Sequence, residues 1–237
     1  MDRLKIYDTV DQLCEGFSLY LKELLEDKTF NICLSGGSTP KSLFQYWSDK
    51  YNEKIPWHKI NFFWGDERCV PPNHEDSNYG MTSQYLFKNI QIPEKNIFRI
   101  RGEDNPDQEA GRYGNIIQEH VPHNGNVPQF DLVILGLGDD GHTASIFPHQ
   151  INFWNSKNNC IKAEHPVNHQ TRISITGKII NNAKNVAFLV TGKKKAKMIK
   201  KVALRKKLFA DNFPAAKVDP YSGNLLWFLD SDAASKL

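Results

Sequence analysis

The segment Asp131–Leu137, DLVILGL, is the strongest buried-strand signal in this 237-residue chain, because apolar residues fill nearly all of its positions. A second segment, Phe30–Leu34 (FNICL), has the same character. Strands that are apolar on both faces are typical of parallel sheets covered by helices on both sides. The rest of the chain is therefore expected to alternate strands with helices.

Further strand and helix patterns do alternate around these two segments. Strands are expected at Leu4–Tyr7, Ile60–Trp64, Ile97–Ile100, Arg172–Thr176, Val186–Val190 and Leu225–Leu229. Helices are expected from Asp8, from Pro40, over Ser77–Leu86, over Pro106–His120 and over the lysine-rich segment Lys193–Lys207. This order predicts an α/β fold: a single domain over residues 1–237 with a mostly parallel, Rossmann-like sheet flanked by helices. The least patterned region, Asn152–His169, is expected to be a surface excursion that either shapes the entrance to a site or is an insertion.

The composition, 40% apolar and 24% charged, is that of a globular protein. No stretch approaches the roughly 18 apolar residues of a membrane helix, and the start of the chain, with Asp2, does not resemble a secretory signal. We therefore expect a cytoplasmic protein without a membrane partner.

The four cysteines form no C-x-x-C pair, which favours reduced thiols over a disulfide or zinc site, with Cys33 and Cys160 in the core.

The positive net charge of +3 comes from one segment. Lys193–Lys207 holds 9 of the 30 basic residues and no acid, which leaves 21 basic and 27 acidic residues elsewhere. Such a run can bind nucleic acid or an acidic membrane. We favour an amphipathic surface helix, with Ile199, Val202, Ala203 and Phe209 facing inward.

Ligands of open parallel sheets bind beyond the carboxyl ends of the strands. We therefore expect functional residues directly after each predicted strand. Ser35–Pro40, SGGSTP, joins a strand to a helix. Gly36 and Gly37 allow a sharp turn, and Ser38 or Thr39 can cap the helix. Such a turn favours a phosphate, and an ordinary capped helix start is the alternative. It matches neither the Walker A loop nor the G-x-G-x-x-G fingerprint.

Trp64–Arg68, WGDER, places three adjacent charges after a strand. Asp66 and Arg68 are candidates to orient polar substrate groups or to tune a base, and a surface salt-bridge cluster is the alternative. The glycine-rich segment Gly136–Ser145, GLGDDGHTAS, follows DLVIL and contains His142, two residues after Asp140. Histidine titrates near neutrality and suits general acid–base catalysis. No G-x-S-x-G elbow occurs, which disfavours a serine hydrolase.

Two later segments add cations near strand ends. Arg172 opens the segment RISIT, and Gly192–Ala196, GKKKA, begins the lysine-rich helix. A cation beside the glycine turn can complete a phosphate site, although a solvated charge is the more common reading of either residue alone.

Taken together, the chain resembles the 6-phosphogluconolactonases, which belong to a wider family with glucosamine-6-phosphate deaminase/isomerase. The resemblance rests on SGGSTP, WGDERCVPPNHEDSNYG, DLVILGLGDDGHTASIFP, TRISIT and TGKKKA in this order, between Phe30 and Ala196, and on LLWFLDSDAA near the end. It implies hydrolysis of 6-phospho-D-glucono-1,5-lactone to 6-phosphogluconate in the oxidative pentose phosphate pathway.

The resemblance also implies roles for individual residues. His142 would be the base that activates water, and Asp140, Asp66 and Arg68 would line the same cleft. The substrate phosphate would be held by Gly36, Gly37, Ser38, Thr39, Arg172 and Lys195. A lactone is an activated ester, so we expect no covalent nucleophile, metal or organic cofactor. The expected partner is this small molecule and no nucleic acid, and the chain is expected to be a monomer.

Two other functions remain as alternatives. A deaminase-type motif resembles D-G-H-I-A-F-N-E-P, with a carboxylate before the proline, but here Phe147 occupies that position. Arg68 also stands where the deaminase has a tyrosine. Both departures favour the lactonase. A non-catalytic sugar-phosphate or nucleic-acid binder would have no need for His142, Asp140 and Asp66 together.

Overall fold

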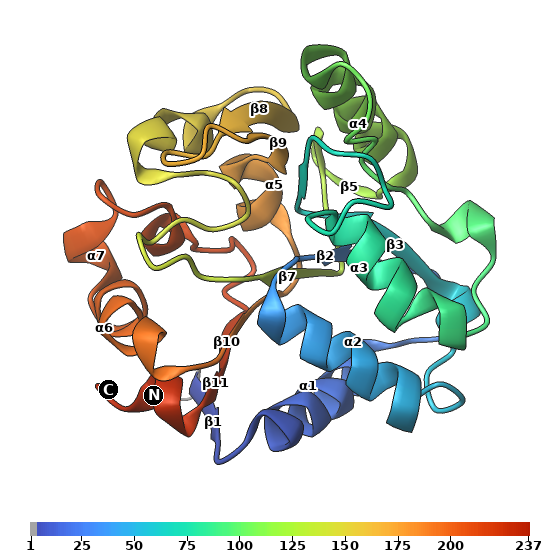
Figure 1. Ribbon diagram of the computed structural model, residues 1–237, viewed down its shortest axis with the longest axis horizontal. Coiled ribbons are helices and arrows are strands. Elements are labelled where there is room, and N and C mark those ends of the chain that lie inside the picture. The colour runs from blue at the N-terminus through green and yellow to red at the C-terminus, as the bar shows by residue number, and fades with distance from the viewer. Residues whose placement is uncertain (1–3) are drawn as a thin grey trace.

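A six-stranded parallel sheet runs through the middle of the computed structural model, which describes residues 4–237 (Figure 1). Asp2 lies outside the described residues. Each hydrogen-bonded pair of strands in this sheet is parallel, in the order β1-β11-β10-β7-β2-β3. The strands are β1 (Leu4–Tyr7), β2 (Phe30–Leu34), β3 (Ile60–Trp64), β7 (Leu132–Leu135), β10 (Val186–Val190) and β11 (Leu225–Asp230). The predicted α/β fold with a mostly parallel sheet flanked by helices is confirmed.

Helices lie on both sides of this sheet (Figure 1). They are α1 (Val10–Leu24), α2 (Ser38–Lys50), α3 (Asn78–Tyr85), α4 (Pro106–His120), α5 (Gly177–Asn182), α6 (Ala196–Ile199), α7 (Lys206–Phe209) and α8 (Ser231–Ala234). α1 shows why they form: Thr9 caps its start by accepting from the Gln12 amide, and Leu13, Phe17 and Leu21 bury one face. α1 packs on α2, and α2 packs on α3.

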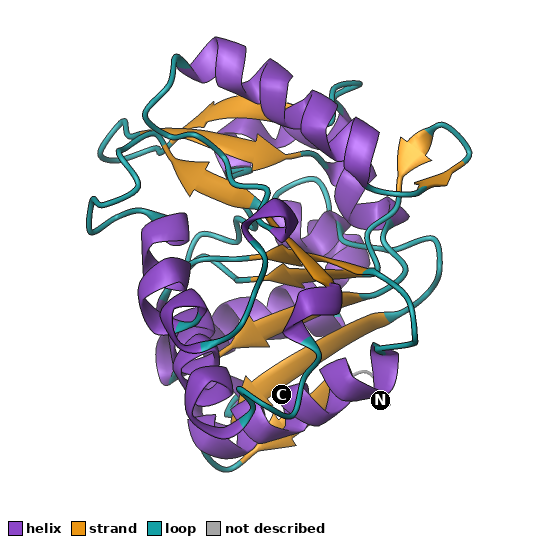
Figure 2. Cartoon of the chain, turned by 90° about the vertical axis from the view of Figure 1, so that its right-hand side faces the viewer, coloured by secondary structure: helices purple, strands orange, loops and turns teal. Residues whose placement is uncertain are grey.

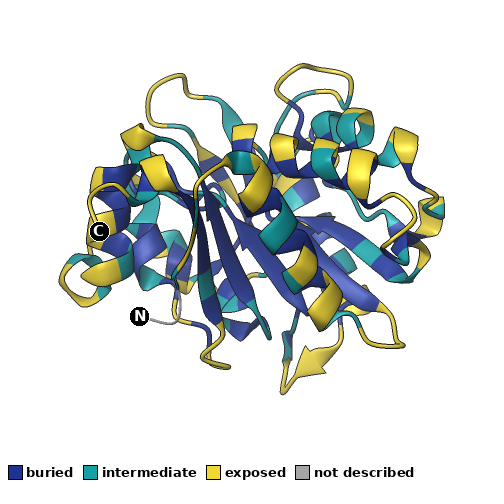
Figure 3. Cartoon of the chain, turned by 90° about the horizontal axis from the view of Figure 1, so that it is seen from below, coloured by how far each residue is buried: buried dark blue, intermediate teal, exposed yellow. Residues whose placement is uncertain are grey.

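The core lies between the sheet and these helices. β2, β7 and β10 are buried at every position, as expected for strands covered on both faces. Figure 3 shows these strands running through the molecule, with helices buried only on their inward faces. Cys33 and Cys160 are both buried, as predicted. No helix in residues 4–237 is long and apolar enough to cross a membrane.

A second, three-stranded antiparallel sheet lies beyond the first, with α4 packed against it (Figure 2). It contains β4 (Asp66–Arg68), β9 (Thr171–Ile175) and β8 (Cys160–Glu164) in that order. A separate hairpin is formed by β5 (His123–Asn124) and β6 (Val127–Pro128). The strand expected at RISIT exists as β9, but it belongs to this antiparallel sheet.

Two expectations about local structure were wrong. The region Asn152–His169 is not merely an excursion, because it contains β8, whose exposed Lys162 and Glu164 interrupt the apolar pattern that would have marked a strand. Ile97–Ile100 forms no strand: Ile97 makes a single parallel bridge with Phe62.

The lysine-rich segment is helical but is not one regular helix. A 3-10 turn at Lys193–Lys195 is followed by α6, a π-helical stretch at Lys200–Leu204, and α7. Ile199 and Val202 are buried, and Ala203 and Phe209 are partly buried. The amphipathic character is therefore confirmed, with Arg205 (φ −123°, ψ 30°) interrupting the helix.

The order of the strands creates a crevice at the centre of the parallel sheet. From β2 the chain moves to its neighbour β3 on one side, whereas from β7 it moves to β10 on the other. The loops that follow β2 and β7 therefore diverge from adjacent strands, and this switch point is where ligands of open α/β sheets bind.

Candidate active site

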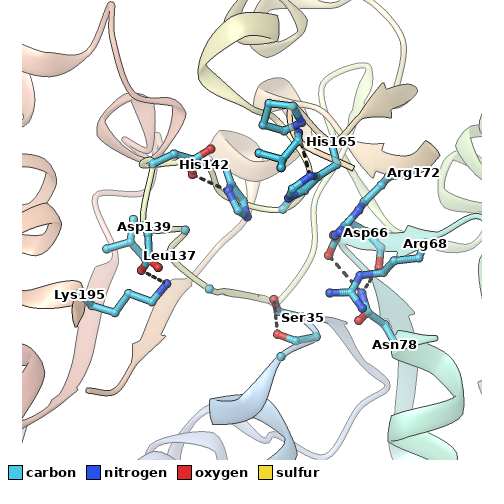
Figure 4. Close-up of a pocket in the computed structure, with 18 residues that line it drawn as sticks. Ser35, Asp66, Arg68, Asn78, Leu137, Asp139, His142, His165, Arg172 and Lys195 are labelled. Carbon is cyan, nitrogen blue, oxygen red and sulfur yellow. Dashed lines mark hydrogen bonds and ion pairs between the residues drawn. The ribbon is translucent and has the colours of Figure 1, made fainter. Parts of the chain in front are cut away.

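A cavity of about 480 Å³ opens at this switch point (Figure 4). The loops after β2 and β7 form one part of its wall, and the antiparallel sheet forms another. The parallel sheet contributes mainly residues of the loops that follow its strands. The antiparallel sheet contributes charged side chains that lie on the strands themselves.

The loop after β2 ends in the turn that starts α2. Gly37 is the residue before the helix and has φ 101°, a left-handed conformation that favours glycine. No side chain caps this helix, so the expected capping by Ser38 or Thr39 was wrong. Thr39 instead shares a 2.8 Å hydroxyl hydrogen bond with Thr191, and Ser38 is exposed. A helix start without a side-chain cap leaves backbone N–H groups available to an anion.

Gly36 has a different reason to be glycine. A Cβ atom built on it would lie 1.8 Å from Oδ1 of Asn78, which packs directly against the turn. Asn78 donates from Nδ2 to the backbone oxygen of Asp66 at 2.8 Å and lines the cavity. Asn78 was not among the predicted site residues, and only the polar sequence before α3 indicated it.

The loop after β7 holds the catalytic candidate His142. Its Nδ1 lies 2.6 Å from Oδ1 of Asp140, and its backbone N–H donates to the same oxygen at 3.1 Å. A carboxylate can only accept here, so Nδ1 carries the proton and Nε2 of the neutral ring keeps its lone pair. Burial raises the pKa of Asp140, but the hydrogen bond and charge of His142 outweigh it, so that pKa lies below its usual value. Asp140 is therefore ionised at neutral pH and can accept the Nδ1–H of the ring.

Backbone conformation holds this pair in place. A Cβ atom on Gly138 would lie 2.1 Å from Nδ1 of His142, so only glycine leaves room for the ring. Gly141 has φ 85°, and Ala144 has φ 48°, which is strained for a residue with a side chain. Thr143 ties the loop back by donating to the Gly136 oxygen at 2.9 Å.

The antiparallel sheet brings Asp66, Arg68 and Arg172 to the cavity. Arg68 and Arg172 are direct partners in the register of β4 and β9. Asp66 is buried and accepts from the Ser145 hydroxyl at 2.5 Å, with Nη1 of Arg172 at 3.9 Å. Glu67, between Asp66 and Arg68, is buried on the opposite face of the strand and accepts from the backbone N–H of Asn78. These charges are therefore not a surface salt-bridge cluster.

Arg68 and Arg172 are incompletely paired. Nε of each is buried and has no hydrogen-bond partner within residues 4–237. Burial lowers the pKa of Arg172, an effect that Asp66 opposes and Arg68 reinforces. Two adjacent positively charged guanidinium groups that line the cavity make this side of it favourable for an anion.

Lys195 approaches the cavity from another direction. Its Nζ is 2.7 Å from Oδ1 of Asp139, whereas Lys193 and Lys194 are exposed and do not line the cavity. Figure 4 shows Lys195 and Arg172 on opposite sides of the cavity. Lys195 also lines a smaller adjoining cavity of about 130 Å³ with residues 36–39. The structure thus brings Lys195 together with the glycine turn, and Arg172 together with Arg68.

His165 also lines the cavity and was not among the predicted site residues. It follows β8, inside the region that sequence patterning left unassigned. The polar, histidine-containing sequence EHPVNHQ directly before TRISIT was the one signal that could have indicated it. Within the described chain, no three His, Cys, Asp or Glu side chains are grouped so that they could hold a metal ion.

The chain matches the family of glucosamine-6-phosphate isomerases and 6-phosphogluconolactonases over residues 7–227. It is 43% identical over 231 residues to a 6-phosphogluconolactonase of Haemophilus influenzae, covering 96% of this chain and 95% of the relative. The solved 6-phosphogluconolactonase of Thermotoga maritima superposes with a TM-score of 0.82 at 28% identity, covering 96% of this chain and 98% of that one. A monomeric glucosamine-6-phosphate deaminase has a TM-score of 0.81 at 19% identity, covering 99% and 100%, so the fold alone does not separate the two activities.

Proposed function

The chain belongs to the family of glucosamine-6-phosphate isomerases and 6-phosphogluconolactonases, as its motifs predict, and we propose that it hydrolyses 6-phospho-D-glucono-1,5-lactone to 6-phosphogluconate. The observation that carries this proposal is the His142–Asp140 pair facing a cavity that is also lined by the cations Arg68, Arg172 and Lys195. A base and an anion site in one cavity are what a phosphorylated ester requires. The relatives named as lactonases support the same substrate.

In the proposed reaction, Nε2 of His142 takes a proton from a water molecule as the water oxygen attacks the lactone carbonyl carbon. Asp140 holds the ring in the required tautomer and stabilises the imidazolium that forms. The carbonyl electron pair moves onto its oxygen. When the carbonyl re-forms, the bond to the ring oxygen breaks, and the imidazolium returns its proton to that oxygen. The net change is the addition of one water molecule.

Binding of the substrate phosphate requires cations and backbone N–H donors at a distance from the lactone carbonyl carbon. The proposed ligands are the turn of Gly36, Gly37, Ser38 and Thr39 together with Arg172 and Lys195. The uncapped start of α2 supports the turn as an anion ligand, and the cavity-lining position of both cations supports their inclusion. Since Lys195 and Arg172 approach from opposite sides, each would contact the ligand from its own side.

Asp66 and Arg68 have supporting roles in this proposal. Asp66 lies beside Arg172 and accepts from Ser145, so it orients the cation while remaining buried. Arg68 donates from Nη1 to the backbone carbonyl oxygen of Asp76 at 2.6 Å, which fixes its guanidinium at the cavity wall. From there it would add a second positive charge toward the substrate.

A deaminase is the main alternative within the family. The position before Pro148 is occupied by Phe147, whose ring is fully buried and lies 4.7 Å from the His142 ring. An apolar ring at this point supplies no carboxylate for ring opening or proton transfer. This contact favours the lactonase over the deaminase.

The test is hydrolysis of freshly generated 6-phosphoglucono-δ-lactone, followed as acid release and corrected for spontaneous hydrolysis. The expected result is a rate proportional to protein concentration and well above that of buffer. A corrected rate of zero would exclude the enzyme and favour a sugar-phosphate binder. Conversion of glucosamine-6-phosphate with ammonia release would instead favour the deaminase.

We further propose that this reaction serves the oxidative pentose phosphate pathway in the cytoplasm and needs no metal or organic cofactor. We expect the enzyme to be a monomer, which sedimentation equilibrium can check. Activity that survives extensive treatment with a chelator is the expected result for the absence of a metal requirement.

A further inference from the structure

His165 is a second histidine at the candidate site, contributed by the antiparallel sheet. It follows β8 at the hairpin that leads to β9, with its backbone N–H donating to the Gln170 oxygen at 3.1 Å. Its ring lines the same cavity as His142 and Arg172, and Figure 4 shows it at the cavity wall between these two residues.

The hydrogen bonds of this ring define its tautomer. Nδ1 accepts from the backbone N–H groups of Val167 and Asn168, each at 3.3 Å. A backbone N–H can only donate, so Nδ1 must carry a lone pair. The neutral ring then has its proton on Nε2, and no hydrogen bond joins Nε2 to another residue in the described part of the chain.

The surroundings oppose a positive charge on this ring. Protonation would direct an Nδ1–H at two other N–H groups. Burial lowers the pKa of His165, the positive charges of Arg172 and Arg68 lower it further, and the charge of Asp140 opposes them. His165 is therefore neutral at neutral pH.

The two histidines consequently offer opposite groups to the cavity. His142 is held at Nδ1 by a carboxylate and offers a lone pair, whereas His165 is held at Nδ1 by two donors and offers an N–H. Phe147 contacts both rings, with centroid distances of 4.7 Å to His142 and 5.3 Å to His165. This buried ring therefore packs against both histidines.

We propose that His165 is a catalytic hydrogen-bond donor, whose Nε2–H binds the lactone carbonyl oxygen and stabilises the negative charge that develops there. The proposal rests on the lactonase function proposed above. No proton is transferred: as the water oxygen bonds to carbon, the carbonyl pair moves onto oxygen and strengthens its bond to Nε2–H. A neutral, pre-oriented donor of this kind acts more strongly on the transition state than on the substrate.

Two substitutions separate this role from a structural one. In His165→Asn, Oδ1 can replace Nδ1 as the acceptor for Val167 and Asn168, but the donor at Nε2 is lost. In His165→Gln, the amide nitrogen can replace Nε2 as the donor, but the acceptor for the hairpin is lost. A structural role predicts that Asn is the better substitute, and a donor role predicts Gln.

The measurements are kcat and KM for the lactone, 6-phosphogluconate affinity and thermal unfolding. For His165→Asn we expect kcat to fall about 10²-fold, the usual loss for one such donor, with KM and product affinity nearly unchanged. For His165→Gln we expect a kcat at least tenfold higher than that of the Asn variant, despite a lower unfolding temperature. His169→Asn, an exposed position on the same hairpin, serves as the control.

The inference is overturned if His165→Asn keeps the wild-type kcat, or if His165→Gln is no more active than His165→Asn. Wild-type protein without corrected lactone hydrolysis would instead refute the function itself. The two failures are therefore distinguished by the activity of the unmodified chain.

Discussion

The two sheets supply the cavity with different kinds of groups. The parallel sheet contributes through loops: the uncapped turn at Gly37 after β2 and the His142–Asp140 pair after β7. The antiparallel sheet contributes charged side chains directly from its strands, with Arg68 opposite Arg172. Loop groups are positioned by glycines and local hydrogen bonds, whereas strand groups are positioned by register.

This difference distinguishes the proposed base, His142, from the proposed phosphate ligand Arg172. The loop side holds the base, which must exchange a proton and keep contact with water. The antiparallel sheet holds the buried Arg172 and the partly buried Arg68, which are fixed before the substrate arrives, so little ordering is needed on binding. Changes at the His142–Asp140 pair should therefore lower kcat, and changes at the proposed phosphate ligands, Arg172 on a strand and Lys195 beside the glycine turn, should raise KM.

The largest effect is expected for His142→Asn. A general base contributes about 10²–10⁴ in rate, so kcat should fall by that factor while 6-phosphogluconate affinity stays close to wild type. Background-corrected turnover and product titration measure the two quantities. The exposed His123 provides the control, and His123→Asn should be indistinguishable from wild type.

The His142–Asp140 pair predicts that kcat/KM depends on pH on the acid side of neutrality. Protonated His142 has no lone pair, so kcat/KM should fall as the pH is lowered, while Asp140, with its depressed pKa, stays ionised. Asp140→Asn should give a milder loss, because it misorients the base without removing it. Full activity in His142→Asn would rule this mechanism out and make Asp66 the next base to test.

Gly138→Ala tests whether the loop side depends on backbone geometry. The new Cβ would lie 2.1 Å from Nδ1 of His142, so the ring has to move. A displacement of about 1 Å can lower the rate about 10²-fold, and we expect a loss of that order in kcat. Gly111→Ala, where a Cβ meets no atom within 4 Å, is the matched control. Unchanged kcat in Gly138→Ala would mean that the position of the ring is not critical.

Sequence reasoning succeeded where local pattern determines structure. β2, β3 and β10 have the expected bounds, because each is an apolar run that ends in polar or glycine residues. β4 was not recognised as a strand, because its residues Asp66–Arg68 are all charged. Its strand conformation depends on pairing with β9, which lies far away in the sequence. β8 was missed for a related reason, since two of its five residues are charged.

The site shows the same division. His142 and Asp140 were predicted as a pair because they are two residues apart, and their contact needs no tertiary information. Asn78 and His165 were missed because they reach the cavity from elements whose packing the pattern does not reveal. Asn78 lies against Gly36, and His165 depends on a hairpin between strands that belong to the second sheet.

Arg172→Gln tests whether the antiparallel sheet binds the substrate phosphate. A hydrogen bond to a charged group contributes about 1.5–3 kcal/mol, so KM should rise roughly 10- to 100-fold, with a smaller change in kcat. Affinity for 6-phosphogluconate should fall, whereas affinity for unphosphorylated gluconate should not, because the lost contact is to the phosphate. The exposed Arg101 is the control, as Arg101→Gln keeps the net charge of the Arg172 variant. Equal losses for both ligands would assign Arg172 to another part of the substrate.

The smallest effect is expected for Lys195→Ala, which asks whether the glycine turn and the cation beside it act together. Lys195 is partly exposed and paired with Asp139, so its removal should raise KM only several-fold, in keeping with a contribution of about 1 kcal/mol from a partly solvated charge. Lys194 is adjacent in sequence, carries the same charge and faces solvent, so Lys194→Ala should leave KM unchanged. Because both variants change the net charge equally, raising the salt concentration should shrink any long-range effect in both alike. A difference that survives high salt would assign a direct contact to Lys195. If Lys194→Ala proved as damaging as Lys195→Ala, the contact would be absent, and the phosphate site would rest on Arg172 and the turn alone.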